Sequence, residues 1–376
     1  MSKENLPGLY VHIPFCRSKC PYCDFYSETE SSMISAWQSA LEQEMLLYRK
    51  RFPTFDTLYI GGGTPTVLEG HVLLYLFDQL YRYFHFTADA EITIEANPND
   101  LTGVKLHILN VCGVNRISLG VQSFDEQDLL FLKRRHTVCE AEKALDLIRT
   151  YDFSNVSIDL MYGIPGQTIE GWLKTLERAV TFHPGHVSCY QLTVVEETKL
   201  WEMQKSAMIK MPDESEGKAF FLTTAQRLED HGYLHYEITS FASGEKNRSR
   251  HNQKYWQHIP YLGLGPSAHS FQHGKRWWNH RSVAKYCHAF AEGKTPVSGA
   301  ETLTREQLDL ESLYLGLRTN SGVELTHLTA NRYFDALLPE LLKAEYVKII
   351  GQKMVPTKKG FLIADRLPLA LTQNLQ

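Results

Sequence analysis

The feature of this 376-residue sequence that most limits its fold is a repeated alternation of short β-rich runs and helical patterns. Six candidate strands read, in chain order, GLYVHI, TLYI, EITIEA, RISLGV, NVSIDLMYG and HVSCYQL. Apolar residues between them recur at helical spacing, beginning with Met33, Trp37, Leu41, Met45 and Tyr48. Such repeats join parallel strands through right-handed crossovers, and six units are too few for an eight-stranded barrel. The pattern predicts an α/β fold, either an open doubly wound sheet or a partial barrel.

Polar or glycine-rich residues end four of the predicted strands. GGGTP follows TLYI, Glu95 and Gln122 end the next two strands, and Asp159 lies late in a fourth. In parallel α/β folds, functional groups gather where the carboxyl ends of the strands meet. Side chains alternate along a strand, so Glu95 and Asp159 face away from their isoleucine neighbours. We expect this polar face to line the inside of the sheet.

The composition describes an ordinary folded protein. Hydrophobic residues make up 43% of the chain and the formal net charge is −4, so no global basic field would attract nucleic acid or anionic lipid. The start, MSKENLPGLYVHIP, has no basic segment followed by an apolar one, and the apolar run VLLYLF is too short to span a bilayer. We expect a cytoplasmic protein without nucleic-acid partners and without an integral membrane segment.

Three cysteines, Cys16, Cys20 and Cys23, lie within eight residues, whereas the other four are scattered singly. An odd total in a reducing compartment argues against a disulfide framework. Three thiolates can hold three irons of a [4Fe–4S] cluster and leave the fourth iron open. Two alternatives remain at this point: a zinc site, which needs a fourth ligand such as His12, and a redox pair formed by Cys20 and Cys23.

The spacing C-x3-C-x-Y-C after LYVHIPF, followed by GGGTP, resembles the radical S-adenosylmethionine (SAM) superfamily. The resemblance implies a partial (β/α)6 barrel, which decides between the two architectures. It also implies that Cys16, Cys20 and Cys23 ligate a [4Fe–4S] cluster. The amino and carboxylate groups of SAM would chelate the open iron, and one electron would release a 5′-deoxyadenosyl radical.

The same resemblance implies which residues surround the cluster and SAM. It places Tyr10 and Tyr22 beside the cluster and near SAM, where aromatic bulk limits solvent. The GGGTP backbone, including Gly62, Gly63 and Thr64, would approach the ligand closely and receive the ammonium of SAM.

Four polar residues complete this implied SAM site. Glu95 and Asp159 would accept hydrogen bonds from the hydroxyls or the amine of SAM. Arg134 would pair with its carboxylate, and Gln122 would offer a neutral donor and acceptor at the same rim.

Six motifs narrow the resemblance to one family: LYVHIPFC, GGGTPT, IEANP, RISLGVQSF, IDLMYGIPGQ and HNQKYW. Together they resemble the oxygen-independent coproporphyrinogen III oxidases (HemN) and, within that family, the HemW branch, whose members are regarded as haem chaperones. The HemN cysteine motif continues with Gly-Cys, whereas Asp24 and Phe25 stand here. Only nine residues precede Tyr10, whereas HemN has an N-terminal extension that contributes to its substrate site. Both departures favour the HemW branch.

The motif HNQKYW is the positive sign of that branch. His251 could ligate haem iron, and Tyr255 and Trp256 could stack on the porphyrin. From residue chemistry alone, a loop anchored by its Tyr and Trp is the stronger interpretation, and only the resemblance reverses the order. His269 is the second candidate for the axial ligand.

Three parts of the chain are expected: a radical SAM partial barrel over residues 1–240, a loop-rich extension over 241–303, and a small winged-helix-like α+β module over 304–376. The last is expected to be a structural cap or interaction surface. The resulting hypothesis is a haem chaperone that binds haem, the cluster and SAM and delivers haem to acceptors such as respiratory enzymes. The alternatives are a coproporphyrinogen III oxidase, whose activity is not expected, and a zinc-stapled structural protein.

Overall fold

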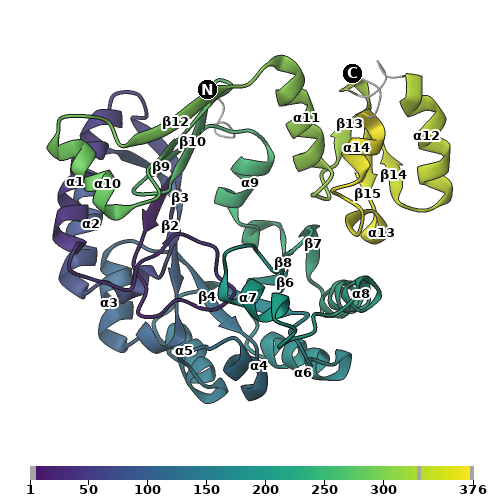
Figure 1. The fold of residues 1–376 in the computed structure, drawn as a ribbon, viewed down its shortest axis with the longest axis horizontal. Coiled ribbons are helices and arrows are strands. Elements are labelled where there is room, and N and C mark those ends of the chain that lie inside the picture. The colour runs from purple at the N-terminus through teal and green to yellow at the C-terminus, as the bar shows by residue number, and fades with distance from the viewer. Residues whose placement is uncertain (1–5, 328–331, 373–376) are drawn as a thin grey trace.

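The computed structural model describes residues 6–327 and 332–372. All six predicted strands are present, and each pairs in parallel with the next (Figure 1). They are β1 (Gly8–Ile13), β2 (Thr54–Gly62), β3 (His85–Ala96), β4 (Arg116–Gln122), β5 (Asn155–Tyr162) and β6 (His186–Gln191). The sheet does not close on itself, because β1 also pairs with β9 and β6 also pairs with β8. The predicted partial barrel is confirmed.

Helices connect these strands and cover the outer side of the curved sheet (Figure 1). They are α1 (Ile34–Tyr48), α2 (Gly70–Tyr83), α3 (Gly103–Val111), α4 (Glu126–Phe131), α5 (Val138–Thr150), α6 (Ile169–Val180), α7 (Lys199–Lys205) and α8 (Glu214–Asp230). Threonine side chains cap several N-termini, as the local sequence favours. Thr137 forms a capping box with Glu140 at α5, and Thr168 accepts a hydrogen bond from the backbone N–H of Gly171 at α6.

Residues 241–303 hold more regular structure than the expected loop-rich extension. With the segment just before them they form β7 (Leu234–Glu237), β8 (Ser240–Ala242), α9 (Arg250–Trp256), β9 (Tyr261–Leu264), β10 (His269–Gln272), β11 (Lys275–Asn279), α10 (Val283–Ala291) and β12 (Val297–Thr302). These strands extend the sheet at both edges, in the order β12-β11-β10-β9-β1-β2-β3-β4-β5-β6-β8-β7. They are short, and their order comes from pairing with the barrel edges rather than from local pattern.

The C-terminal part has its own small core. It comprises α11 (Arg305–Gly316), β13 (Val323–Glu324), α12 (Arg332–Lys343), β14 (Val347–Ile350), β15 (Lys353–Pro356), α13 (Lys358–Phe361) and α14 (Leu367–Thr372). The strands form an antiparallel sheet in the order β13-β15-β14, and Leu317 and Met354 are fully buried in the core of this part. Helix, strand, helix and a strand pair follow one another as expected for a winged-helix-like module. Short 3-10 turns elsewhere are η2 (Pro65–Val67), η3 (Pro98–Asp100), η4 (Glu245–Asn247) and η5 (Leu325–His327).

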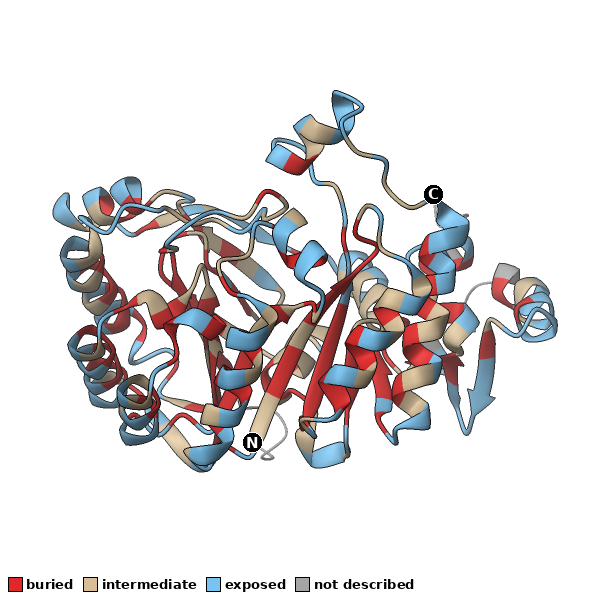
Figure 2. Ribbon diagram, turned by 90° about the horizontal axis from the view of Figure 1, so that it is seen from below, coloured by how far each residue is buried: buried red, intermediate tan, exposed pale blue. Residues whose placement is uncertain are grey.

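The two faces of the barrel sheet differ in chemistry, as the alternation predicts. The outward face packs against the helices, and Leu58, Ile94 and Ile117 on it are fully buried. Figure 2 shows that the strands of the barrel consist largely of buried residues. The inward face is polar: the hydroxyl of Tyr59 donates to Glu95 and that of Ser118 donates to a carboxylate on β5. The main hydrophobic core therefore lies between sheet and helices, and a polar lumen lies inside the sheet.

Candidate functional site

The loop that carries the three cysteines follows β1 and is held by backbone hydrogen bonds. The N–H of Cys16 donates to Glu28 O at 2.9 Å, and the N–H of Glu28 donates to Pro14 O at 2.7 Å. The N–H of Leu200, in α7, donates to Pro21 O at 2.9 Å. Arg17 donates to Asp100 of η3 at 3.1 Å. Elements distant in the sequence thus fix the loop at the carboxyl end of β1.

The GGGTP turn after β2 lies directly against this loop. The N–H groups of Gly63 and Thr64 donate to Ile13 O and Phe15 O at 2.7 and 2.8 Å. A Cβ added at Gly63 would lie 2.6 Å from the Phe15 carbonyl oxygen, and Gly62 has a φ of +108°. Gly63 therefore lets the two backbone segments approach closely, and Gly62 allows a positive φ that other residues rarely adopt.

Two predicted site residues contact the thiols. The Thr64 hydroxyl lies 3.4 Å from Cys16 Sγ, and Arg134 Nη1 donates to Cys20 Sγ at 3.6 Å. Arg134 Nη2 also donates to Gly120 O at 2.7 Å, which fixes the guanidinium at the end of β4. Burial raises the pKa of the Cys23 thiol to about 11. Because metal ligation needs the thiolate, a positive centre has to offset this burial.

Three cysteine thiols are a donor set that suits a multi-iron cluster. Among residues 6–327 and 332–372, no three His, Cys, Asp or Glu side chains converge closely enough to hold one metal ion. Thiolates of a [4Fe–4S] cluster bind different irons and need not converge on one point. The fourth ligand considered for zinc, His12, is already bonded within the protein: Nδ1 lies 2.9 Å from the Tyr10 hydroxyl and Nε2 lies 2.9 Å from Tyr26 O.

Tyr22 and Tyr10 have different surroundings. Tyr22 packs in a small apolar cluster with Leu132, Met161 and Leu200, close to Arg134. The hydroxyl of Tyr10 donates to His12, and its ring centre lies 6.2 Å from that of Tyr59 in the lumen. Burial raises the pKa of both tyrosines, so both stay protonated.

Glu95 is held at the rim by two donors from β2. The Tyr59 hydroxyl donates to Oε1 at 2.8 Å and the Gly62 N–H donates to Oε2 at 3.0 Å. Burial raises the pKa of Glu95 to about 7, against the opposing effect of these donors. The carboxyl is thus poised near neutrality and has lone pairs left for a ligand.

Asp159 and Gln122 occupy the rim of the next two strands. Asp159 accepts hydrogen bonds from Ser118 at 2.9 Å and Ser157 at 3.2 Å, and burial raises its pKa above the ordinary value. Gln122 has a φ of +73° beside a bulge, where the register to β5 shifts after Gly120. The bulge re-aims the end of β4 at the point where the strand leaves the sheet.

His251 lies apart from the rim. It is buried in α9 beside the amino-terminal half of β2, with Nδ1 2.8 Å from the Thr57 hydroxyl and Nε2 2.8 Å from the Tyr255 hydroxyl. Glu91 accepts the backbone N–H of His251 at 3.0 Å and anchors the helix. Burial lowers the pKa of His251 to about 3, so the ring is neutral. Both ring nitrogens are bonded within the protein.

The structure therefore brings together most of the predicted residues. The carboxyl ends of β1 to β5 carry the cysteine loop, the GGGTP turn, Glu95, Gln122, Arg134 and Asp159. His251 lies away from them, beside the amino-terminal half of β2. Sequence reasoning missed Tyr59, which positions Glu95, and Arg116, a buried arginine of the lumen. The alternation that placed Ser118 on the polar face also applied to Arg116, two residues before it.

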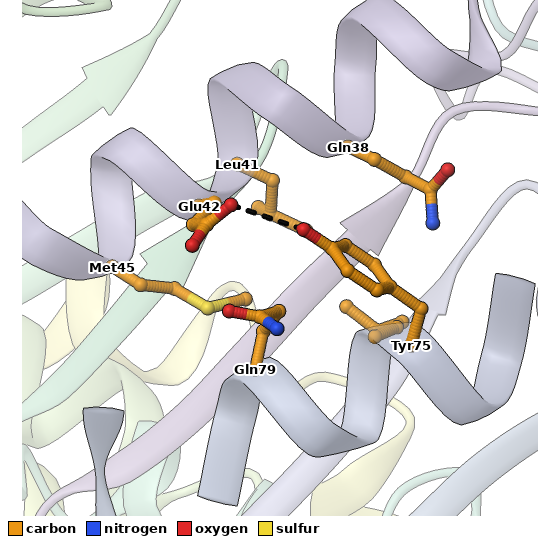
Figure 3. Close-up of a pocket in the computed structure, with 7 residues that line it drawn as sticks. Gln38, Leu41, Glu42, Met45, Tyr75 and Gln79 are labelled. Carbon is orange, nitrogen blue, oxygen red and sulfur yellow. Dashed lines mark hydrogen bonds between the residues drawn. The ribbon is translucent and has the colours of Figure 1, made fainter. Parts of the chain in front are cut away.

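A shallow pocket on the outer surface lies away from this site. Gln38, Glu42 and Met45 of α1 face Tyr75 and Gln79 of α2 across it, and the Tyr75 hydroxyl donates to Glu42 (Figure 3). No residue of the predicted site lines it. In the described parts of the chain, no helix has the length and apolar character needed to cross a membrane.

Comparisons with known proteins place the chain in a family. The model of the Radical SAM superfamily matches residues 10–179. The chain is 34% identical to the heme chaperone HemW of Bacillus subtilis over 90% of both chains, and 31% identical to that of Lactococcus lactis over 98% of this chain and 97% of the relative. The solved structure of coproporphyrinogen III oxidase (HemN) from Escherichia coli, a radical SAM enzyme, matches with a TM-score of 0.85 at 26% identity, over 99% of this chain and 91% of that one. The chain therefore belongs to the HemW family, within the radical SAM superfamily.

Proposed function

We propose that this protein is a haem chaperone that binds haem, a [4Fe–4S] cluster and SAM, and hands haem to acceptor proteins such as respiratory enzymes. The observation that carries the proposal is the match over nine tenths of the chain to proteins named heme chaperone HemW. We further propose the cytoplasm as its compartment and no nucleic-acid partner.

The three cysteines are proposed to hold the cluster. A bound cluster would supply one electron for the cleavage of SAM. Cys16 lies against Thr64, Cys20 accepts from Arg134, and the Cys23 N–H donates to Cys20 O at 3.2 Å. This tight turn and the Gly63 contact hold the loop in one shape, which supports a prepared ligand set.

The rim residues are proposed to orient SAM. Glu95 and Asp159 would accept from its hydroxyls or amine, and the guanidinium of Arg134, already tied to Gly120 O, would meet its carboxylate. Tyr59 would hold Glu95 in place. The groups come from separate strands, so the sheet sets their spacing.

His251 is proposed as the axial haem ligand, and its surroundings define what ligation requires. For Nε2 to bind iron, its hydrogen bond with the Tyr255 hydroxyl has to break, whereas the hydrogen bond between Nδ1 and the Thr57 hydroxyl can remain. The neutral ring that burial favours is the form that ligates metals. Removing the competing hydroxyl in Tyr255→Phe should therefore keep or strengthen haem binding, whereas His251→Ala should weaken it.

The test is an anaerobic titration of reconstituted protein with haem, read by absorbance. Wild type, His251→Ala and Tyr255→Phe are compared, with His269→Ala as the matched control. We expect His251→Ala alone to lose the iron-ligand band. If wild type binds no haem, the proposed function is wrong, and if His269→Ala loses the band instead, the assignment of the ligand is wrong.

Cluster ligation is tested separately by iron and sulfide analysis. Cys16→Ser, Cys20→Ser and Cys23→Ser should each lose most of the iron, about four per wild-type chain by the cluster formula. Cys139→Ser, at an exposed position on α5, should retain it. Stoichiometric zinc in place of iron after anaerobic purification would contradict the cluster.

A coproporphyrinogen III oxidase is the second candidate, because the fold of HemN from Escherichia coli covers 99% of this chain. Incubation with coproporphyrinogen III, SAM and a reductant separates the two functions. We expect no decarboxylation. Release of CO2 with 5′-deoxyadenosine would establish the oxidase in place of the chaperone.

A further inference from the structure

Arg116 is a buried arginine inside the barrel that the proposed site does not use. It opens β4, and its neighbour Ile117 packs into the outer core, so Arg116 points to the opposite, inward face. Its charge acts on Glu95, Asp159 and His186, all on the lumen side. Only 2% of its surface is exposed.

The Nε of this guanidinium has no hydrogen-bond partner in the described residues 6–327 and 332–372, although it is buried. Glu95 and Asp159 act on it as nearby opposite charges. The buried Asp100, by contrast, is contacted by both Arg17 and Arg135. Arginine is almost never fully buried unless it is paired, because taking the ion out of water costs several kcal/mol.

Two further polar atoms beside Arg116 are also unpaired. In the sheet register Arg116 pairs with Thr93 on β3 and with Asn155 on β5, so the three side chains share one row on the inward face. Thr93 Oγ1 and Asn155 Oδ1 are buried without a hydrogen-bond partner. A hydroxyl and an amide, turned to present its N–H, can both donate to the same acceptor as the guanidinium.

The other donors at this level are already satisfied. His186 is bonded to the hydroxyls of Ser157 and Tyr236 at 2.8 Å each, and His251 is bonded to Thr57 and Tyr255. Among the described residues, the row of Arg116 therefore keeps hydrogen-bonding capacity that these two histidines do not.

We propose that Arg116, with Thr93 and Asn155, is a binding site for a ligand carboxylate inside the barrel. The inference rests on the proposed function for the identity of that ligand, since the propionates are the carboxylates of haem. The guanidinium would form the charge-assisted pair, and the hydroxyl and amide would complete the acceptor shell. The lumen wall is polar, so it suits a propionate rather than the apolar porphyrin face.

The test compares wild type with Arg116→Met and Arg116→Lys, and with Arg178→Met as the control. Arg178 lies on the outer surface and pairs with Glu142 of α5. Haem, haem dimethyl ester, SAM and free propionate are the probes. Replacing a buried ion by an apolar side chain should not lower the thermal midpoint of the ligand-free protein, which separates a binding role from a structural one.

We expect Arg116→Met to lose about ten- to a hundred-fold in haem affinity, the effect of removing a hydrogen bond between charged groups. Arg116→Lys should recover part of it, and haem dimethyl ester should bind wild type and Arg116→Met alike. Free propionate should raise the thermal midpoint of wild type and not that of Arg116→Met.

Equal haem affinity in wild type and Arg116→Met, or selective loss of SAM affinity, would overturn the inference and leave the proposed function standing. A large fall in the thermal midpoint of ligand-free Arg116→Met would also overturn it, by showing a structural role. If wild type binds no haem, the proposed function is wrong, and the carboxylate site is then tested by free propionate alone. A rise in the thermal midpoint of wild type with propionate supports the site. No rise means that Arg116, Thr93 and Asn155 bind only water, which overturns the inference.

Discussion

At the scale of single residues, buried carboxylates and glycines set the chemistry of the rim. Glu95 keeps two donors from β2 and a pKa near 7, because burial disfavours its charge. Gly63 lets the turn after β2 touch the cysteine loop. The pKa of Glu95 predicts that SAM binding depends on pH. The close contact at Gly63 predicts that a larger residue there disturbs the cysteine loop.

SAM binding should depend on the ionisation of Glu95. The carboxylate is the better acceptor, so the affinity of wild type should fall as the pH drops through about 7. Glu95→Gln should bind more weakly at pH 8 and show little change between pH 6 and 8. Equilibrium dialysis of SAM across this range checks the expectation, and the same pH profile in both proteins would contradict it.

Gly63→Ala should lower the cluster content. The new Cβ would meet the carbonyl oxygens of Phe15 and Ile13 at 2.6 and 2.9 Å, and overpacking of this kind costs about 1–3 kcal/mol. Iron analysis after reconstitution measures the effect. Gly171→Ala in α6 is the matched control, because its Cβ would meet only Thr168 Oγ1 at 3.4 Å. Full iron loading of Gly63→Ala would argue against the tight contact.

At the scale of elements, a single buried glutamate joins α1 to the edge of the sheet. Glu44 accepts from the Gly265 N–H at 2.8 Å, from Asn279 at 2.7 Å and from the Tyr286 hydroxyl at 2.6 Å. These partners lie after β9, on β11 and on α10. Glu44 thereby fixes the added strands against the barrel, which explains why this region is ordered although its local pattern is weak.

Glu44→Ala should destabilise the protein by about 2–5 kcal/mol, since it leaves three buried donors without an acceptor. Urea unfolding of the cluster-free protein measures the loss. Glu44→Gln keeps an acceptor and should cost less. Burial raises the pKa of Glu44 from 4.5 to about 7, so the unfolding free energy of wild type should decrease as the pH rises through this interval. Glu44→Gln has no ionisable group at this position, so this pH dependence should be absent from its unfolding free energy. Equal stability of Glu44→Ala and wild type would contradict the role.

At the scale of the whole molecule, the C-terminal module has its own core and meets the barrel beside β7. The Ile238 N–H donates to Arg318 O at 3.1 Å, and the Asn320 N–H donates to Tyr236 O at 3.0 Å. The Arg318 side chain adds ion pairs to Glu237 at 3.6 Å and to Asp365 at 2.9 Å. Arg318 thus links the module to β7, and Lys358, which pairs with Glu229 of α8, adds a second contact with the barrel.

Arg318→Ala should loosen this docking by about 1 kcal/mol, the scale of a partly exposed ion pair. Hydrogen exchange of β13 to β15 should increase while that of β1 to β6 stays unchanged. Arg305→Ala, which removes an exposed pair with Asp309 within α11, should change neither. Faster exchange throughout the barrel would mean that Arg318 supports the whole fold instead.

The sequence by itself determined the six parallel strands, their polar inward face and the cysteine loop, because each rests on local period or on neighbours in the chain. It also carried the resemblance that pointed to the family. Only the tertiary structure decided that Thr57 and His251, 194 residues apart, are bonded and that Glu44 orders the added strands. It also decided that Arg116 Nε has no hydrogen-bond partner within the described part of the chain. The physical reason is that satisfaction of a buried polar group depends on distant segments meeting, which no local pattern encodes.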